Sequence, residues 1–555
     1  MGAAKKARGR TATRPSNLGL VFEHFAGSDG ASWNVDRPFD LTPKGDTRYT
    51  VADLAQLVEE TSAGLHQVGL RYGDRLAIIK DNHLDSVVIA AAAARIGAIP
   101  ALCSATVRPA LLRRMMQRLE PAVLVASSTL LADAAEQGVE LVPPSVPTIV
   151  IGGTAMDPAP PADLPTFADL GGAPVPPARP RPDHEPMVCT HTSGTTGMPK
   201  FVVHSANTSI GTNARLETMR IPFLSTRDDD VIVSSIAFVH VRCLTWTVAQ
   251  LTLPPKDVVV IADPSPATVV QTLTRHRPTT LEACPNIYQL WQGLTGTHPE
   301  LFANVRAYLS TFDAIHPPTV RAFLRVSRRR LPVWGQSWGQ SEFGPASLAV
   351  YTRFSVRERR SSRRPGAADQ AFTTDVGYPI PGVIKWKVVD PQTRQEVPRG
   401  RRGLVLVRSR GRCLTYLGED DRHRAKDWDG WWNTGDIGVH RRSGRLRILD
   451  REVDSIPGTS GIELESLLLD RLDGATEVIM LGNPGGRPVP VLSTRDGRLD
   501  PAAWARATAG LPPLAEPRLI GWDEFPRTGT WKVRRSDLRE RILHSTETFG
   551  TGRWT

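Results

Sequence analysis

Residues 190–200 read THTSGTTGMPK, a run in which hydroxyl side chains and glycines lead to a single lysine. Short apolar strands are predicted at residues 187–191 and 201–203, so the polar segment between them is predicted to be a tight loop. Glycines let backbone N–H groups approach phosphate oxygens closely, while Ser and Thr add hydroxyl donors and Lys adds a positive charge. This composition predicts that the loop binds the phosphates of ATP.

The spacing of the loop differs from that of the Walker phosphate loop, in which Gly, four residues and Gly-Lys-Ser/Thr open a helix. Here Lys200 leads into the apolar residues 201–203 instead. A polar hairpin turn is the alternative, because Ser, Thr and Gly are ordinary turn formers. The candidate phosphate-binding residues are Thr192, Ser193, Gly194, Thr195, Thr196, Gly197 and Lys200.

Further motifs follow in a fixed order along the chain. They are WGQSE (338–342), TDVGYPIPG (374–382), WNTGD (432–436), DR (450–451) and PRTGTWK (526–532). Together with residues 190–200, these motifs resemble those of the adenylate-forming superfamily, which includes acyl-CoA synthetases, peptide-synthetase adenylation domains, luciferases and aryl-acid amide ligases. The ordered recurrence makes the resemblance specific, and it covers most of the chain.

The resemblance implies an α/β fold with a large N-terminal adenylation domain of several subdomains and a small, mobile C-terminal α+β lid. We expect a disordered basic tail at residues 1–16, the adenylate-forming domain at 17–450 and the lid at 451–555. A chain of 555 residues exceeds one hydrophobic core. Its first half alternates helix and strand, which is typical of layered α/β folds.

The resemblance also implies roles for single residues of the motifs. Glu342 would bind Mg²⁺, a cation that prefers carboxylate and phosphate oxygens. Asp436 would accept hydrogen bonds from the ribose hydroxyls, to which Arg451 would donate. Lys532 would be the mobile catalytic lysine, brought by the lid to the reacting carboxylate and the α-phosphate. The other predicted nucleotide-binding residues are Asp313, Ala314, Trp338, Gly339, Gln340 and Ser341, with Trp338 offering adenine a face for stacking.

The substrate pocket is predicted from fewer signals. His240 matches a family residue near the substrate carboxylate, although a histidine satisfied within the core is the alternative. Arg242 and Trp246 would line the pocket together with Phe312. The two aromatic side chains point to a flat, aryl-like substrate.

These motifs predict an ATP- and Mg²⁺-dependent ligase that adenylates a carboxylate and releases pyrophosphate. The sequence leaves the acceptor open between CoA, a carrier-protein thiol and an amine. An alternative with the same nucleotide site is adenylation of nitrite for the diazotisation of an arylamine. A second alternative is a non-catalytic basic binding protein on a degenerate ligase scaffold.

Three departures from the family pattern bear on the acceptor. The loop between Ile456 and Glu463 is several residues shorter than the usual loop, which helps to shape the pantetheine channel in thioester-forming members. In addition, Val453 stands where the hinge usually carries Asp or Lys, and Trp531 replaces the glycine before the catalytic lysine. These changes leave adenylation intact and disfavour transfer to a thiol.

Charge and cysteine content limit the possible partners. The formal charge of +11 would admit nucleic acid, but the basic clusters at residues 328–330, 357–364 and 399–402 lack interleaved aromatic residues. We therefore predict no nucleic-acid partner, and assign no chemistry to the arginine-rich loop 354–372. The five cysteines form no CxxC pair, which favours a reduced, cytoplasmic location.

The most apolar run, residues 87–102, is interrupted by Arg95 and Pro100. It is therefore predicted to be a buried helix that leads into a strand, and not a membrane span. No membrane partner is expected.

Overall fold

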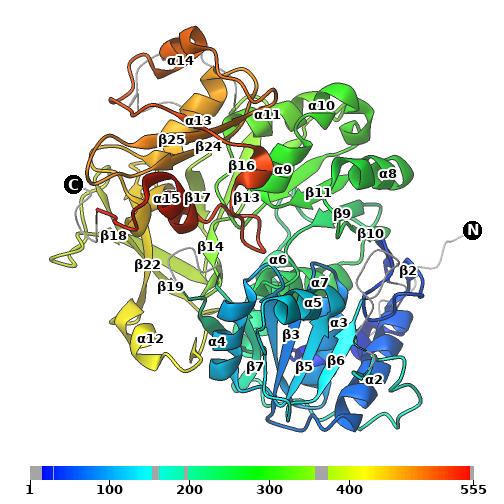
Figure 1. Ribbon diagram of the computed structural model, residues 1–555. Coiled ribbons are helices and arrows are strands. Elements are labelled where there is room, and N and C mark those ends of the chain that lie inside the picture. The colour runs from blue at the N-terminus through cyan, green and yellow to red at the C-terminus, as the bar shows by residue number, and fades with distance from the viewer. Residues whose placement is uncertain are drawn as a thin grey trace, which may run out of the picture.

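The computed structural model describes residues 15–28, 30–152, 161, 163–192, 198–356 and 373–549. Within them, two large β-sheets and their helices form the body of the molecule, and a small C-terminal α+β unit lies at one end (Figure 1). The α/β class and the two-part organisation confirm the sequence-based prediction. Most of the expected N-terminal tail (residues 1–14 of 1–16) and of the arginine-rich loop (357–372) lies outside the described residues.

The first sheet has seven strands and carries the loop quoted above. Its spatial order is β20 (Thr415–Tyr416), β8 (Phe201–Ser205), β7 (Pro186–His191), β4 (Ile99–Ser104), β3 (Arg75–Lys80), β5 (Val123–Ser127) and β6 (Thr148–Ile151). Strands β7 and β8 are antiparallel, and His191 pairs with Phe201, so residues 192–200 connect two neighbouring strands as predicted. Residues 193–197 of this loop lie outside the described residues.

The second sheet has 14 strands and spans the body of the molecule. Its order is β18 (Ile384–Val389), β19 (Arg402–Ser409), β22 (Trp431–His440), β23 (Leu446–Arg451), β17 (Asp375–Pro379), β16 (Ser347–Thr352), β13 (Val333–Gln336), β12 (Ala307–Ser310), β11 (Thr280–Ala283), β9 (Val231–Ser235), β10 (Asp257–Val260), β1 (Ser32–Val35) and β2 (Arg48–Tyr49), with β21 (Asp427–Trp428) beside β22.

A continuous apolar core joins the two sheets through α3 (Asp85–Arg95) and α7 (Val241–Thr252). All eleven residues of α3 are buried, which fits a helix that is apolar all round. The predicted helix within residues 87–102 is therefore confirmed, and it leads into β4. Helix α7 begins at the end of the segment that follows β9, and this position brings its first turn to the functional site described below.

Helix α2 (Val51–Gln67) begins with a capping box formed by Thr50 and Asp53. The Asp53 backbone N–H donates to Thr50 Oγ1 at 3.1 Å, and the Thr50 backbone N–H donates to Asp53 Oδ2 at 2.7 Å. Two N–H groups that have no partner within the helix are satisfied in this way.

Replacing Thr50 with Ala should lower the local opening free energy of the first turn of α2 by about 1 kcal/mol, the usual cost of losing a capping hydroxyl. Hydrogen exchange of peptides that cover residues 50–56 measures this directly. Thr50→Ser keeps the hydroxyl and should stay close to the wild type. Equal exchange in Thr50→Ala and the wild type would show that the cap adds nothing here.

Among the described residues, the C-terminal unit contains a three-stranded sheet and three α-helices. They are β24 (Ala475–Leu481), β25 (Val489–Thr494), β26 (Arg518–Leu519), α13 (Gly461–Arg471), α14 (Pro501–Thr508) and α15 (Arg535–Leu543). Its mobility and the residue boundaries of the domains stay predictions.

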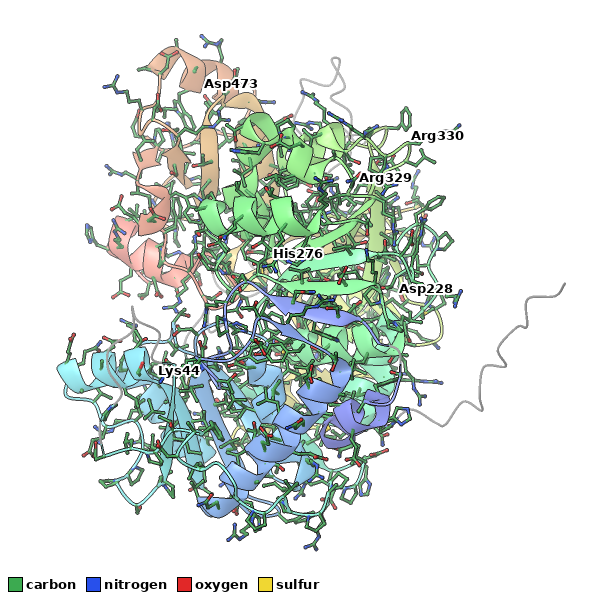
Figure 2. The ribbon with its side chains drawn as sticks, turned by 90° about the vertical axis from the view of Figure 1, so that its right-hand side faces the viewer. Lys44, Asp228, His276, Arg329, Arg330 and Asp473 are labelled. Carbon is green, nitrogen blue, oxygen red and sulfur yellow. The ribbon has the colours of Figure 1, made fainter. Side chains whose placement is uncertain are left out.

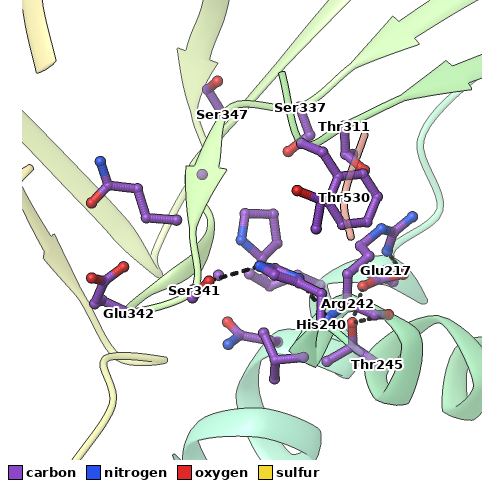
Figure 3. Close-up of a pocket in the computed structure, with 18 of the residues that line it drawn as sticks. Glu217, His240, Arg242, Thr245, Thr311, Ser337, Ser341, Glu342, Ser347 and Thr530 are labelled. Atoms are coloured by element: carbon purple, nitrogen blue, oxygen red, sulfur yellow. Dashed lines mark hydrogen bonds and ion pairs between the residues drawn. The ribbon is translucent and has the colours of Figure 1, made fainter. Parts of the chain in front are cut away.

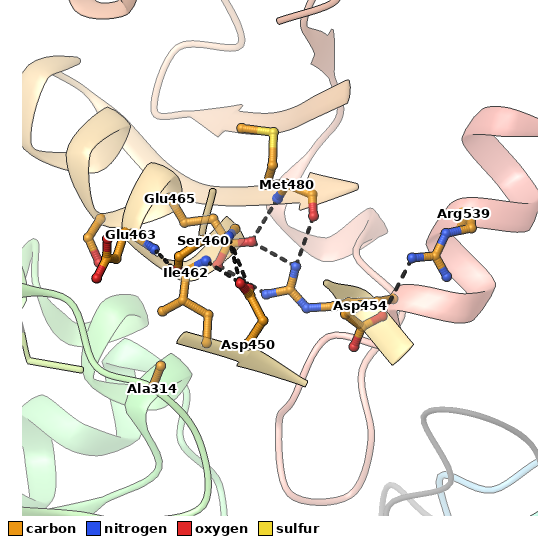
Figure 4. Close-up of polar contacts among 12 residues, drawn as sticks. Ala314, Asp450, Asp454, Ser460, Ile462, Glu463, Glu465, Met480 and Arg539 are labelled. Atoms are coloured by element: carbon orange, nitrogen blue, oxygen red, sulfur yellow. Dashed lines mark hydrogen bonds and ion pairs between the residues drawn. The ribbon is translucent and has the colours of Figure 1, made fainter. Parts of the chain in front are cut away.

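Buried polar contacts connect this unit to β23 (Figure 4). The Asp450 carboxylate accepts the Gly461 backbone N–H at 3.0 Å, and the Ser460 hydroxyl donates to the Leu449 carbonyl at 2.6 Å. Arg535 holds Glu465 through two bonds of 2.7 and 3.0 Å. The short loop before α13 is thereby folded back on β23.

Charged side chains of both signs lie on the outer face shown in Figure 2, among them Lys44, Asp228, Arg329, Arg330 and Asp473, all of which are exposed. In the part of the chain that the structure describes, no helix is both long and apolar enough to cross a membrane.

Candidate active site

A cavity of about 690 Å³ contains most of the residues that the motifs singled out. It is lined by both sheets, by α7 and by the segment 528–532 of the C-terminal unit. Thr192 and Lys200, at the two ends of the phosphate loop, belong to this lining, and the Thr192 backbone N–H donates to the Lys200 carbonyl at 3.0 Å. Ser193, Gly194, Thr195, Thr196 and Gly197 lie outside the described residues.

His240 occupies the centre of the cavity, as the residue that caps the start of α7 (Figure 3). Its Nδ1 accepts the Arg242 backbone N–H at 3.1 Å, so the ring proton lies on Nε2, which donates to Ser341 Oγ at 2.8 Å. Burial, together with the charge of Lys532, lowers the pKa of His240 to about 3. The imidazole is therefore neutral at physiological pH and acts as a hydrogen-bond donor.

Lys532 reaches the cavity on a loop that is closed by Thr528. The Thr528 backbone N–H donates to the Lys532 carbonyl at 2.9 Å, and the Lys532 N–H donates to Thr528 Oγ1 at 3.2 Å. Burial lowers the pKa of Lys532, although Asp313 opposes this effect. Gly529 packs against β4 so closely that a Cβ there would lie 2.2 Å from Ser104 Oγ, so this position requires glycine.

Trp531, which departs from the family's glycine, adopts a φ of +63°, the left-handed conformation that glycine favours. Its ring stacks on Trp522, with the ring centroids 6.1 Å apart. Trp531 therefore adopts a backbone conformation that glycine favours, and the stacked pair supports it.

Glu342 and Lys200 lie on the same side of the cavity. Glu342 is 9% exposed and accepts a hydrogen bond from Tyr416 Oη at 2.6 Å, while Lys200 Nζ lies 4.9 Å from the centroid of the Tyr416 ring. Among the described residues, no group of three or more His, Cys, Asp or Glu is placed to hold a metal ion. A single carboxylate still suits Mg²⁺, which is commonly bound by one or two carboxylates together with substrate phosphates.

Asp436 and Arg451 are brought together by the pairing of β22 and β23. Arg451 Nε lies 3.1 Å from Asp436 Oδ1, and Asp436 Oδ2 accepts from Trp338 Nε1 at 3.1 Å and from Gln340 Nε2 at 3.0 Å. Both carboxylate oxygens are thus engaged, and Asp436 is not part of the cavity lining, so its binding of the ribose stays a prediction. Trp338 is partly buried and does not line the cavity, so adenine stacking on it stays a prediction.

The remaining predicted residues divide into two groups. Gly339, Gln340, Arg242, Trp246 and Phe312 line the cavity. Trp246 is only 1% exposed and packs edge-on against Trp33 and Phe238, so it forms a wall and not a free face. Asp313 and Ala314 are not part of the lining; Asp313 is exposed.

Sequence reasoning missed two acidic residues of the cavity. Glu217 and Glu282 both form ion pairs with Arg242. They belong to α6 (Arg215–Glu217) and to β11, far from Arg242 and from each other in the sequence, and neither lies in a motif. Only the packing of α6 and β11 against α7 reveals this cluster.

A family model described as "AMP-binding enzyme" matches residues 29–417. The chain belongs to this family. A 3-amino-2-hydroxy-4-methoxybenzoate diazotase from Streptomyces cremeus is 36% identical to it over 545 residues, which cover 95% of each chain. A 4-coumarate–CoA ligase 5 from Oryza sativa subsp. japonica is 23% identical over 546 residues, again 95% of each chain.

Solved structures of this superfamily share the fold. An anthranilate CoA ligase, AuaEII, in complex with anthranoyl-AMP superposes with a TM-score of 0.76 at 19% identity, covering 95% of this chain and 97% of the other. The amide bond synthetase McbA from Marinactinospora thermotolerans gives a TM-score of 0.71 at 20% identity, covering 95% and 100%. The protein is thus an ATP-dependent, AMP-forming ligase of the adenylate-forming superfamily, as the motifs predicted.

Proposed function

We propose that the protein is an ATP-dependent diazotase, which adenylates nitrite and transfers the nitroso group to an aromatic amine. The observation that carries this proposal is the 36% identity to the S. cremeus diazotase over 95% of both chains. Over the same share of the chain, the identity to the rice CoA ligase is 23%.

The chemistry fits the nucleotide site described above. A nitrite oxygen attacks the α-phosphorus of ATP, and the bond from that phosphorus to pyrophosphate breaks. The amine nitrogen then attacks the nitroso nitrogen, the N–O bond to AMP breaks, and both amine hydrogens leave with the nitroso oxygen as water, which gives the diazonium ion. Mg²⁺ bound at Glu342 would neutralise charge on the phosphates.

His240 and Lys532 suit a small anionic nucleophile. The neutral imidazole offers an N–H donor, and the lysine offers a positive charge that the cavity shields from water. Both groups stabilise charge where nitrite meets the α-phosphate, so the same pair that would hold a carboxylate serves nitrite equally well.

The shape of the loop before α13 supports an amine acceptor over a thiol. Ile456 and Thr459 form an isolated β-bridge, and Ser460 donates to β23, so the loop is a tight turn against the sheet. A turn of this length offers few residues for a pantetheine groove. An acceptor without such a groove loses the orientation that accelerates transfer.

With nitrite and ATP at pH 8, the protein should release pyrophosphate and AMP, and addition of an aromatic amine should yield a diazonium ion. Formation of azo dye with a naphthol, together with incorporation of ¹⁵N from labelled nitrite, measures the product. Omission of ATP is the control for spontaneous diazotisation.

Benzoates, fatty acids and CoA should support little turnover in the same assay. Pyrophosphate release with a carboxylic acid but not with nitrite would overturn the proposal and return the protein to the acid ligases.

A further inference from the structure

Five side chains form one wall of the cavity, which we call the α7 wall: Glu217, Arg242, Thr245, Gln250 and Glu282. Arg242 Nη2 lies 2.6 Å from Glu282 Oε1, and Nη1 pairs with Glu217. The Thr245 hydroxyl donates to Glu217. Figure 3 shows Glu217, Arg242 and Thr245 together on the side of His240 that faces away from Glu342.

Arg242 Nη1, Arg242 Nη2 and the Thr245 hydroxyl are bonded to carboxylates of this wall, whereas Arg242 Nε, on the guanidinium that the two carboxylates share, and Gln250 Oε1 are buried without a hydrogen-bond partner. Arg242 is shared between two carboxylates, so the formal charges of the three groups sum to −1. Gln250 is 7% exposed, and its buried side-chain oxygen Oε1 accepts no hydrogen bond. A buried acceptor without a partner is costly, and a ligand that donates to it would remove that cost.

Because the α7 wall is buried, its net charge strongly affects which ligand groups can bind beside it. Glu282 has a side-chain exposure of 1%, and Glu217 one of 12%. Burial raises the pKa of Glu217, and the charge of Arg242 opposes this rise. A second anion beside this cluster would be repelled in a medium of low dielectric, whereas an N–H or O–H donor would be attracted.

The neighbouring walls are apolar and suit an aromatic ring. Leu216, Val239 and Trp246 are buried lining residues, and Phe312 lies edge-on to His240 with the ring centroids 5.2 Å apart. A ring held between them would direct its substituents toward the α7 wall.

We propose that the α7 wall selects an aromatic amine whose ring carries a hydroxyl or second amino group facing Glu217, and rejects one with a carboxylate there. The inference rests on the proposed function for the identity of the ligand as an aromatic amine. The S. cremeus diazotase is named for a benzoate, so the two proteins would differ in this feature.

Equilibrium binding of para-aminophenol and para-aminobenzoate tests the proposal without any chemistry. In the presence of AMP, calorimetry on the whole protein should show para-aminophenol binding more tightly to the wild type. Glu217→Gln should weaken para-aminophenol by roughly 10- to 100-fold, the scale of a hydrogen bond to a charged group. The same variant should strengthen para-aminobenzoate.

Glu282→Gln is the matched control. It removes the negative charge of the other carboxylate that pairs with Arg242, and this carboxylate is only 1% exposed. It should strengthen para-aminobenzoate, as Glu217→Gln does, yet leave para-aminophenol bound within about threefold of the wild type, since Glu217 keeps its acceptor oxygens. Tighter wild-type binding of para-aminobenzoate, or equal losses for both ligands in Glu217→Gln, would overturn the inference.

Gln250→Met serves if Glu217→Gln does not fold. It removes an acceptor that makes no hydrogen bond in the structure, and it should still weaken the binding of para-aminophenol and spare that of para-aminobenzoate. Equal affinities of this variant and the wild type for para-aminophenol would contradict the proposed selection by the α7 wall. These measurements need no nitrite, so the two proposals can fail separately. If the binding preference is absent but nitrite-dependent AMP release occurs, only the inference about the α7 wall fails. If the binding preference is present but nitrite gives no AMP, only the diazotase proposal fails.

Discussion

Lys532→Ala should lower the rate of adenylation by roughly 10²- to 10³-fold, the scale of losing one preorganised donor to a developing charge. Lys532 lies in the cavity on a loop closed by Thr528, and its charge contributes to the low pKa of His240. The measurement is pyrophosphate release with saturating ATP and nitrite. Activity above half that of the wild type would remove Lys532 from the mechanism.

Arg534→Ala separates loss of the lysine charge from loss of docking. Arg534 Nη2 donates to the Thr106 carbonyl at 3.0 Å and helps to hold the C-terminal unit against the turn that follows β4. A tenfold or smaller loss in this variant would show that the larger effect of Lys532→Ala comes from the missing ammonium group.

The same lysine should set the alkaline limit of activity. Burial lowers its pKa below the usual value of 10.5, against the pull of Asp313 and Asp436. The charged form is the active one, so the rate should fall as the pH rises through this lowered pKa. Lys532→Arg should move that limit to higher pH, because guanidinium stays charged.

The motif residues could be predicted because each motif places several of them next to one another in sequence. Asp436 and Arg451 were identified from their motifs alone. The pairing of β22 with β23 explains why the two side chains lie next to each other. The strands around the phosphate loop were predicted for the same local reason, since apolar runs flank a polar turn.

The α7 wall could not be predicted in this way. Arg242 could be predicted as a pocket residue because it is close to His240 in the sequence. Glu217 and Glu282 belong to separate elements, and no motif contains them. For Trp338 the sequence identified the motif, but it did not predict that the indole N–H donates to Asp436. Long-range packing decides the direction of a side chain, and a motif alone does not encode it.

Two neighbours, Tyr416 and Lys200, lie beside Glu342, the carboxylate that we expect to bind Mg²⁺. Tyr416 Oη donates to Oε1 at 2.6 Å and orients the carboxylate, and burial together with the charge of Glu342 raises the pKa of the phenol, which therefore stays protonated. Lys200 lies on the same side, and Mg²⁺ held by Glu342 would add positive charge near the phosphates that this loop is expected to bind.

Glu342→Gln should therefore lower the rate on the order of 10²-fold and raise the Mg²⁺ concentration needed for half-maximal activity by at least about tenfold, because the amide keeps the shape but loses the charge that binds the cation. A magnesium titration of pyrophosphate release measures both effects. Tyr416→Phe is the control, since it leaves the charge and removes only the orienting bond. Its loss of metal affinity should be smaller than that of Glu342→Gln, at most about tenfold, the lower end of the range for a group that orients a ligand. An unchanged titration in Glu342→Gln would place the metal on another group, and a larger shift in Tyr416→Phe than in Glu342→Gln would make orientation, not charge, the contribution of this carboxylate.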